Sequence, residues 1–314
     1  MKGLKRLSHY PVMLNEVLAA LSPVDGGVYV DGTFGAGGYS RAILDAADCT
    51  VVAIDRDPDA AKRAEDLSRN YAGRLIFLRG CFGDVESLLA GAGIEKVDGF
   101  VLDLGVSSFQ LDQAERGFSF RADAPLDMRM DPESGKGAAD LIAQMDEKEL
   151  ADLIYKYGEE RKSRQIARRI VEMRRAAPIE TTGQLAEIVR CCVPKSRDGI
   201  DPATRTFQAL RIAVNDELGE LERALNAAEN ILKPGGRMVV ISFHSLEDGL
   251  VKRFFRSQSG AEAVSRYLPQ TENDPAKLRL LTRKAVKPGE QEIAENSRSR
   301  SARLRGAQYI GGAS

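Results

Sequence analysis

A glycine-rich turn and a later acidic residue have the types and spacing of a nucleotide-binding site. The turn covers residues 31–40, after a short β-rich run and before a helix-compatible stretch. Its glycines let the backbone turn sharply and approach a ligand without a Cβ clash. Asp55 ends the next apolar run, about 20 residues after the glycines, where an acid accepts hydrogen bonds from both ribose hydroxyls. Together they predict a site for an adenosine-containing ligand.

The turn alone does not identify that ligand. A nicotinamide dinucleotide site has the fingerprint G-x-G-x-x-G, and here the run from Gly35 reaches Ser40 where the third glycine would stand. A tight turn without any ligand is a second reading, because glycines often interrupt α/β loops. Asp55 or Asp57 could also be the N-cap of a helix that starts near Pro58. These alternatives stay open on local sequence.

Four further residues follow later apolar runs. Phe82 lies where an adenine could stack, although a core phenylalanine is the commoner explanation. Asp103 ends the fourth run. Ser242 ends the fifth run, and His244 follows it. Ligands of open α/β sheets bind at the carboxyl ends of the strands, so these side chains are candidates for contact with the reacting groups. A structural, hydrogen-bonded His244 is an equally good reading.

Alternating apolar runs and helix-compatible stretches must position these residues. Such alternation predicts βαβ units and a parallel sheet covered on both faces. The predicted strands are 28–31, 51–55, 75–78, 100–103 and 237–242, with 278–283 and 302–309 as a final pair. The predicted helices among them are 38–47, 58–70, 84–92 and 246–257.

A helical insertion interrupts this pattern. Residues 110–137 have little periodicity and predict an ordered but irregular loop. Apolar residues then recur in steps of three and four, as an amphipathic helix requires. The predicted helices are 146–157, 160–175, 181–192 and one longer helix from about 207 that ends at 233–236. We therefore expect an α/β domain over 1–110 and 216–314, and a loop with an all-helical domain over 111–215.

Composition argues against several other classes. The 314 residues are 43% hydrophobic and 29% charged, as in soluble globular proteins, and no apolar run approaches the roughly 20 residues that span a membrane. We expect a cytoplasmic protein without a membrane partner. The four cysteines form no C-x-x-C pair and only two histidines are present, so we expect no metal site.

The net charge of −1 conceals two basic segments. Residues 161–175 contain seven Lys or Arg and one Glu, and residues 277–305 contain nine Lys or Arg and three Glu. Such segments can bind phosphates even in a nearly neutral protein, and solvated surfaces have the same composition.

Long blocks of sequence, in order, resemble the bacterial 16S rRNA cytosine-N4 methyltransferase family, RsmH or MraW. The most specific block is Asp103-Leu104-Gly105-Val106-Ser107-Ser108. The other similar blocks are 9–16, 31–40, 55–58, 110–112, 116–120, 125–130, 158–160, 202–211, 242–248 and 296–305. The resemblance covers almost the whole chain. It implies a class I, Rossmann-like methyltransferase fold, with a mostly parallel seven-stranded sheet and an inserted all-helical domain.

The resemblance also implies an activity and its site. The reaction would transfer a methyl group from S-adenosylmethionine to N4 of a specific cytidine, cytidine 1402, in the decoding region of 16S rRNA. The partner would be the small ribosomal subunit, and the helical domain would recognise RNA. The sequence leaves the oligomeric state open, a homodimer included. The implied cofactor contacts are Gly37, Gly38, Tyr39, Asp55, Phe82, Asp103 and Gln110.

Three positions depart from the family pattern. Tyr39 and Asp201 stand where His is usual, and Gly249 stands where Arg is frequent. These departures put side-chain roles at the three positions in doubt, but not the activity. A contact at Tyr39 would then involve its backbone.

Methyl transfer to cytosine N4 makes specific demands. The amine is a poor nucleophile because its lone pair is delocalised into the ring, so the enzyme must hold it about 3 Å from the methyl group and relieve the developing charge. Many amino-methyltransferases use an Asp/Asn-Pro-Pro-aromatic loop, whereas this chain has Asp103-Leu104-Gly105-Val106. We hypothesise that Asp103 accepts a hydrogen bond from the amine or positions the methionine part of the cofactor. Ser242 and His244 would contact the base.

Two other functions compete with this reading. An NAD-dependent oxidoreductase would use the same kind of turn, and a non-catalytic RNA-binding or ribosome-assembly factor could retain the fold alone. Asp55 and the glycine turn argue against the second, because a degenerate site is free to lose both.

Overall fold

The computed structural model describes residues 10–195, 199–260 and 275–311. His9, at the start of the first block of family resemblance, lies outside them. The chain divides into two compact units, one formed by Met1–Gly105 and Gly219–Ser314 and the other by Val106–Leu218. These boundaries lie a few residues from those expected from the sequence. We call the first the sheet unit and the second the helical unit, and describe each by itself.

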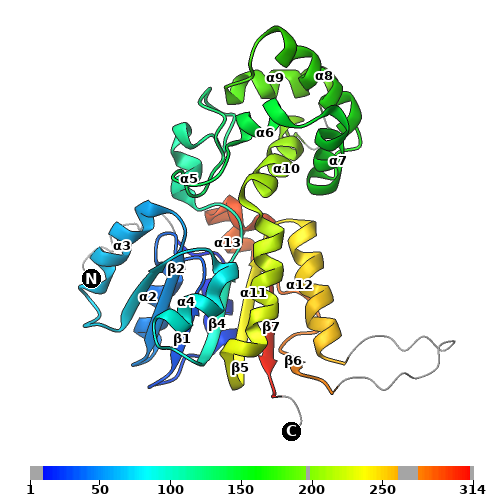
Figure 1. The fold of residues 1–314 in the computed structure, drawn as a ribbon. Helices are drawn as coiled ribbons and strands as arrows, with labels where there is room; N and C mark the ends of the chain where they lie inside the picture. Colours follow the sequence, from blue (N-terminus) through cyan, green and yellow to red (C-terminus); the bar gives the residue numbers. More distant parts are fainter. Residues whose placement is uncertain (1–9, 196–198, 261–274, 312–314) are drawn as a thin grey trace, which may run out of the picture. The chain divides into compact units, whose positions relative to one another are not determined.

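A seven-stranded sheet forms the centre of the sheet unit (Figure 1). Its strand order is β3-β2-β1-β4-β5-β7-β6. The first five strands are parallel to their neighbours, and β7 is antiparallel to both β5 and β6. The mostly parallel seven-stranded sheet predicted from sequence is confirmed. The strands are β1 (Val28–Asp31), β2 (Thr50–Asp55), β3 (Leu75–Arg79), β4 (Val97–Asp103), β5 (Leu232–Ser242), β6 (Leu278–Leu280) and β7 (Arg303–Tyr309).

Side chains alternate between two apolar layers because successive residues of a strand point to opposite faces. Val51 and Ala53 pack with buried residues of α1 (Leu14–Leu21), α2 (Gly38–Ala46) and α3 (Pro58–Ser68). Val52 and Ile54 pack instead with α4 (Val85–Gly91), α11 (Glu217–Ile231) and α12 (Ser245–Gln258). Burial on both faces explains why β2 is an unbroken apolar run in the sequence.

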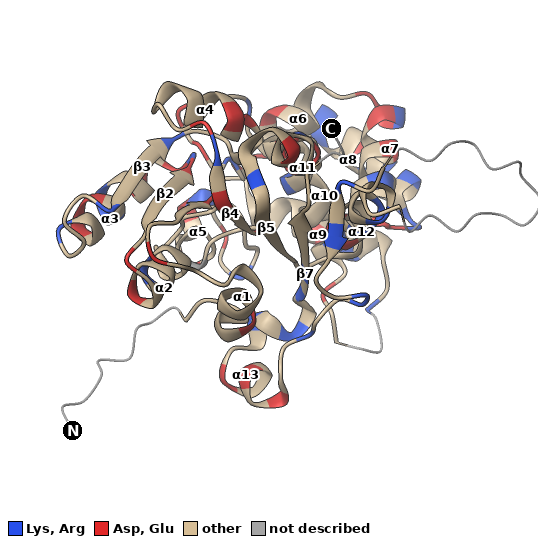
Figure 2. Ribbon diagram, turned by 90° about the horizontal axis from the view of Figure 1, so that it is seen from below, with Lys and Arg blue, Asp and Glu red and all other residues tan. Residues whose placement is uncertain are grey.

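Strand register places the candidate site residues at one edge of this sheet. Asp31 pairs with Val101, Asp103 pairs with Ile241, and Asp55 ends β2 beside them. The three acids therefore end neighbouring parallel strands, β2, β1 and β4. Beyond β6, α13 (Glu290–Glu295) is a short helix whose acidic residues are red in Figure 2.

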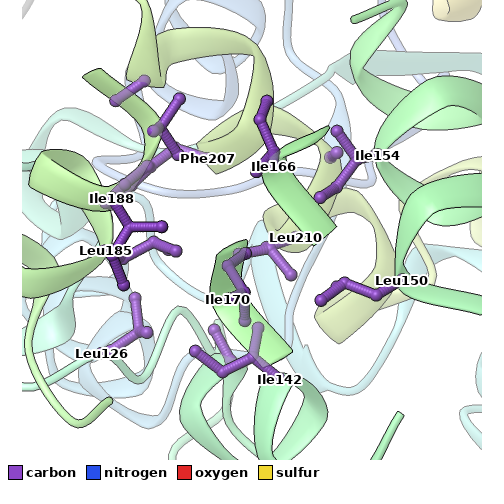
Figure 3. Packing of buried hydrophobic residues seen from close by; sticks show 14 of the residues in the cluster. Leu126, Ile142, Leu150, Ile154, Ile166, Ile170, Leu185, Ile188, Phe207 and Leu210 are labelled. Carbon is purple, nitrogen blue, oxygen red and sulfur yellow. The ribbon is translucent and has the colours of Figure 1, made fainter. Parts of the chain in front are cut away.

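The helical unit has its own core. Its helices are α5 (Ser108–Asp112), α6 (Ala138–Gln144), α7 (Glu147–Gly158), α8 (Ser163–Ala176), α9 (Thr182–Cys192) and α10 (Ala203–Asn215). Capping boxes start α7 at Asp146 and α9 at Thr181, where each side chain accepts from the backbone three residues on. Leu150, Ile154, Ile166 and the other labelled residues of Figure 3 interdigitate in this core.

The irregular loop before α6 is attached to α10 through Asn215. Its side-chain oxygen accepts from the Met130 N–H at 2.7 Å, and its amide donates to the Met128 carbonyl at 2.7 Å. Asn215 is buried, so these bonds satisfy polar groups that water does not reach. The ordered but irregular loop expected from the sequence thus has a specific anchor.

One predicted helix is wrong. The apolar spacing from Phe207 to Leu225 predicts a single long helix, but α10 ends at Asn215 and α11 begins at Glu217. Asp216 between them has φ of 48°, in the left-handed region that interrupts a helix. Apolar spacing continues across the break, so periodicity could not reveal it. No helix among the described residues is long and apolar enough to cross a membrane.

Candidate functional site

Asp31 folds the glycine-rich turn. It ends β1, is fully buried, and its Oδ2 accepts from both the N–H and the hydroxyl of Ser40, at 3.1 and 2.7 Å. Its Oδ1 accepts from the Thr33 N–H at 3.2 Å. Burial raises the pKa of Asp31 to about 6, against the lowering effect of these hydrogen bonds. The sequence interpretation gave Asp31 no role, although an acid followed by Thr and Ser donors is a recognisable signal.

Asp55 joins the same turn to β2. Its Oδ2 accepts from the Gly35 N–H at 2.7 Å, and its Oδ1 accepts from the Asp57 N–H at 2.9 Å. Burial raises the pKa of Asp55, and these two backbone donors lower it. Each carboxylate oxygen has a second lone pair, so Asp55 can still accept hydrogen bonds from a ligand. The N-cap of α3 is Asp57, which accepts from the Asp59 N–H at 3.1 Å.

Gly37 and Gly38 are required by packing at the start of α2. Gly37 has φ of 75°, and a Cβ there would lie 2.8 Å from the Phe34 ring. A Cβ on Gly38 would lie 2.3 Å from Cγ of Pro11. The N-cap residue Gly37 has no side chain, and Asp31 caps only the Ser40 N–H, so the N–H groups of Gly38 and Tyr39 have no acceptor among the described residues. Such N–H groups at a helix N-terminus favour a negatively charged group.

Tyr39 points into the protein. Its side chain is buried, and its hydroxyl donates to the Val12 carbonyl at 2.6 Å. The next residue, Met13, donates its N–H to Glu292 Oε1 at 2.7 Å. Residues 11–13 therefore join the start of α2 to α13, and Tyr39 offers a ligand its backbone.

Phe82 lies beside the turn. It starts a short 3-10 helix (Phe82–Asp84), is half-buried, and packs against the apolar layer on its face of the sheet. A Cβ added to Gly32 would lie 3.3 Å from Cβ of Phe82. The Phe82 side chain thus makes the contacts of a core phenylalanine. It also lies next to the glycine turn, as stacking on an adenine would require.

Asp103 has an unsatisfied carboxyl oxygen. Its backbone N–H donates to Oγ1 of Thr33 at 2.7 Å, which fixes the end of β4 against the turn. Its Oδ1 is buried without a hydrogen-bond partner among the described residues. Burial, followed by the negative charge of Asp31, raises the pKa of Asp103 to about 8; the Tyr39 hydroxyl lowers it, and Glu247 raises it. A buried acceptor among acidic groups favours a cationic or hydrogen-bond-donating ligand.

Ser242 and His244 are engaged in local structure. The Ser242 hydroxyl donates to the Arg303 carbonyl at 3.3 Å. His244 is the N-cap of α12, where its Nδ1 faces the Glu247 N–H at 3.5 Å. Its Nε2 lies 3.0 Å from Oε1 of Glu247 but without hydrogen-bonding geometry. These contacts match the structural reading of His244.

The remaining predicted positions also have defined partners. Gln110 is buried in the helical unit, where its Oε1 accepts from the Ser107 N–H at 3.0 Å and starts α5. Asp201 accepts from Nη2 of Arg190 at 2.9 Å and from the Ala203 N–H at 2.9 Å. Gly249 lies within α12.

Comparison with known proteins identifies the family. Residues 6–310 match the sequence profile of the MraW methylase family. The chain belongs to this family. S-adenosylmethionine is its cofactor, and the sheet unit has the class I methyltransferase fold expected from the sequence. Membership in a methylase family decides against the NAD-dependent oxidoreductase.

Curated relatives match over nearly their full length. A protein of Rhodospirillum rubrum named ribosomal RNA small subunit methyltransferase H is 59% identical over 306 residues, covering 96% of this chain and 94% of that protein. A protein of the same name from Granulibacter bethesdensis is 60% identical over 308 residues, covering 96% and 92%. A solved rRNA methylase from Streptococcus thermophilus has a TM-score of 0.43 and 8% identity, covering 97% of this chain and 99% of that one.

The residues of the sheet unit fit this cofactor. The unsatisfied Oδ1 of Asp103 suits a positively charged group, and the N–H groups of Gly38 and Tyr39, which have no acceptor among the described residues, suit a carboxylate. S-adenosylmethionine carries both kinds of group. The spare lone pairs of Asp55 suit its ribose hydroxyls.

Proposed function

We propose that this chain transfers a methyl group from S-adenosylmethionine to N4 of a specific cytidine, cytidine 1402, in the decoding region of 16S rRNA. The observation that carries the proposal is the unsatisfied, buried Oδ1 of Asp103 beside a turn held by Asp31 and Asp55. The names of the similar proteins support the small ribosomal subunit as the source of the substrate.

The cofactor would be held by residues at the edge of the sheet unit. Asp55 would accept from the ribose hydroxyls, Phe82 would stack on the adenine, and the backbone of Gly37, Gly38 and Tyr39 would hold the carboxylate end. The cofactor contact implied for Gln110 stays a prediction. When bound, S-adenosylmethionine supplies an electrophilic methyl group on a positively charged sulfur.

Asp103 would be the residue closest to the chemistry. In the transfer N4 would gain the methyl group and lose one proton to Asp103 or to solvent, and the cofactor would leave as its demethylated product. A carboxylate that accepts from the amine orients its lone pair and stabilises the charge that develops on nitrogen. Ser242 and His244 would be positioning residues, since their contacts fix the end of β5 and the start of α12.

The helical unit would recognise the RNA. The amine is inaccessible in a stacked helix, so the target base must be unpaired or rotated out. Six of the seven basic residues within 161–175 are exposed, which suits phosphate contacts and predicts strongly salt-dependent binding. In the second basic segment Arg303 and Arg305 pair with Asp248, so fewer charges there remain for RNA.

A labelling experiment tests the proposal. The protein is incubated with methyl-labelled S-adenosylmethionine and small subunits that lack the modification, and the labelled nucleotide is mapped. We expect label on N4 of one cytidine in the decoding region, and label elsewhere would contradict the assignment. The homodimer and the cytoplasmic location stay predictions, which sedimentation and cell fractionation check.

A further inference from the structure

The helical unit contains a hollow beside the start of α8. It has a volume of about 450 Å³ and is lined from α7 by Asp152 and Tyr155 and from the following turn and α8 by residues 161–165. Ligand sites for small molecules typically measure about 300–1,000 Å³, so one nucleotide fits a hollow of this size.

An exposed aromatic side chain forms one wall. Tyr155 is 63% exposed, although tyrosine is usually at least half-buried in a folded protein. It lies on α7 opposite the inward side chains Leu150 and Ile154, which belong to the core of this unit. An exposed aromatic face beside positive charge is the usual platform on which an unpaired base stacks.

The opposite wall favours a phosphate. Arg161, Lys162 and Arg164 are exposed and lie at the start of α8, a 14-residue helix. Its N-cap residue Lys162 offers no capping side chain, and the buried Glu160 carboxylate accepts from the Lys162 N–H at 2.8 Å. The partial positive charge of such an N-terminus adds to that of the three side chains. The exposed pair of Arg164 with Asp152, at 3.6 Å, is weak enough for a phosphate to replace.

Ser163 supplies a second, independent indication of a ligand. Its residue is 4% exposed and lines the hollow. Its N–H donates to the Glu160 carbonyl at 3.2 Å, but its hydroxyl has no hydrogen-bond partner in the described part of the chain. Ser163 is thus a buried residue whose hydroxyl borders the hollow and is engaged by no described group, which suits it to a polar atom of a ligand.

We propose that this hollow binds one unpaired nucleotide of single-stranded RNA. The base stacks on Tyr155, the Ser163 hydroxyl donates to a phosphate or ribose oxygen, and Arg161, Lys162 and Arg164 hold the adjoining phosphates. The inference rests on the proposed function and deepens it. The helical unit would recognise RNA by stacking on an unpaired base as well as by attraction between its basic residues and the phosphates.

The experiment measures RNA affinity of the full chain by fluorescence anisotropy with a labelled five-nucleotide single strand. Tyr155→Ala should weaken binding about fivefold to hundredfold, and Tyr155→Phe, which keeps the aromatic face, should restore it to within about twofold. Ser163→Ala should weaken it by about threefold to tenfold. The controls are Tyr10→Ala, which removes a tyrosine of the sheet unit that is 58% exposed, and Arg69→Ala, which removes an exposed basic residue at the C-cap of α3.

A second probe reports stacking directly. The chain contains no tryptophan, so a 2-aminopurine base in the strand can be excited without protein emission. We expect its fluorescence to be quenched by the wild type and by Tyr155→Phe, and not by Tyr155→Ala. Unchanged affinity and quenching in Tyr155→Ala would overturn the proposal. An equal loss of affinity for a duplex of the same length would also overturn it, because that would reflect charge and shape alone.

Different results would refute the proposed RNA site and the proposed reaction. If the hollow is not a site, Tyr155→Ala binds RNA as the wild type does while methyl transfer to small subunits persists. If the reaction is wrong, no label reaches the cytidine although RNA binding still depends on Tyr155. Affinity for S-adenosylmethionine should be unchanged in every variant of the hollow.

Discussion

The Asp55 carboxylate accepts a hydrogen bond from the Gly35 N–H at 2.7 Å, across 20 residues of sequence. Two further hydrogen bonds fix the glycine turn. Phe34 donates its N–H to the Ile54 carbonyl at 3.0 Å, and the Arg63 side chain donates to the Gly35 carbonyl at 2.8 Å. The conformation of the turn therefore depends on the strand that ends in Asp55, the acid that we propose binds the ribose.

Asp55→Asn should weaken S-adenosylmethionine binding by about tenfold to hundredfold, because hydrogen bonds to a charged acceptor are worth about 1.5–3 kcal/mol. Calorimetric titration with S-adenosylmethionine and its demethylated product checks this. Asp66→Asn, an exposed acid on α3, is the matched control. An Asp55 variant with wild-type affinity would remove the residue from the cofactor site.

Gly38→Ala should both destabilise the protein and impair cofactor binding, because the added Cβ would lie 2.3 Å from Pro11. Overpacking of this kind costs about 1–3 kcal/mol. Gly91→Ala at the end of α4 adds the same methyl group with nothing within 4 Å and should be neutral or slightly stabilising. Thermal melting and cofactor titration of the two variants measure the difference, and equal behaviour would contradict the packing argument.

Affinity for S-adenosylmethionine should rise with pH up to about 8 through Asp103. In the free protein burial and the charge of Asp31 raise the pKa of Asp103 to about 8, with Glu247 acting in the same direction. A bound cation favours the carboxylate and lowers that pKa. Binding below about pH 8 must therefore expel a proton, and affinity increases by at most about tenfold per pH unit until the group is already ionised.

The control for this pH dependence is Asp103→Asn, which cannot titrate. Asp31, with its pKa raised to about 6 by burial, remains in both proteins, so the difference between their profiles isolates Asp103. Parallel profiles would show that Asp103 does not lose a proton when the cofactor binds.

His244→Ala should lower the free energy of unfolding by about 1 kcal/mol, the usual effect of losing an N-cap acceptor. His244→Asn keeps such an acceptor and should restore both stability and methyl transfer, as a positioning role requires. Chemical denaturation and single-turnover methyl transfer are the two measurements. Restored stability without restored transfer would assign His244 to the chemistry instead.

Much of the sheet unit could be predicted because its signals are local. The apolar run at Val51–Ile54 identifies a strand buried on both faces, and the acid that follows identifies its carboxyl end. The helical unit was predictable as a set of amphipathic stripes. The break at Asp216 was not, because a single residue with positive φ leaves the apolar spacing on either side intact.

The roles of individual site residues depend on contacts that sequence spacing does not report. Pro11, which lies 27 positions earlier, leaves no space for a side chain at Gly38. A hydrogen bond from the Tyr39 hydroxyl to the Val12 carbonyl keeps the Tyr39 side chain inside the protein. The sequence signal at Asp31 is an acid followed by Thr33 and Ser40, but which oxygen accepts from which donor is set only by the folded turn. Fold class follows from patterns, whereas these roles follow from tertiary packing.

The link from Pro11, Val12 and Met13 to Glu292 has a consequence for synthesis in the cell. A ribosome releases the glycine turn and its strands early, yet the segment that packs against Gly38 and Tyr39 is anchored by the carboxylate of Glu292, which is translated much later. A nascent chain that stops short of α13 would lack this anchor. Full cofactor affinity should therefore emerge only after α13 has been translated and has left the ribosome.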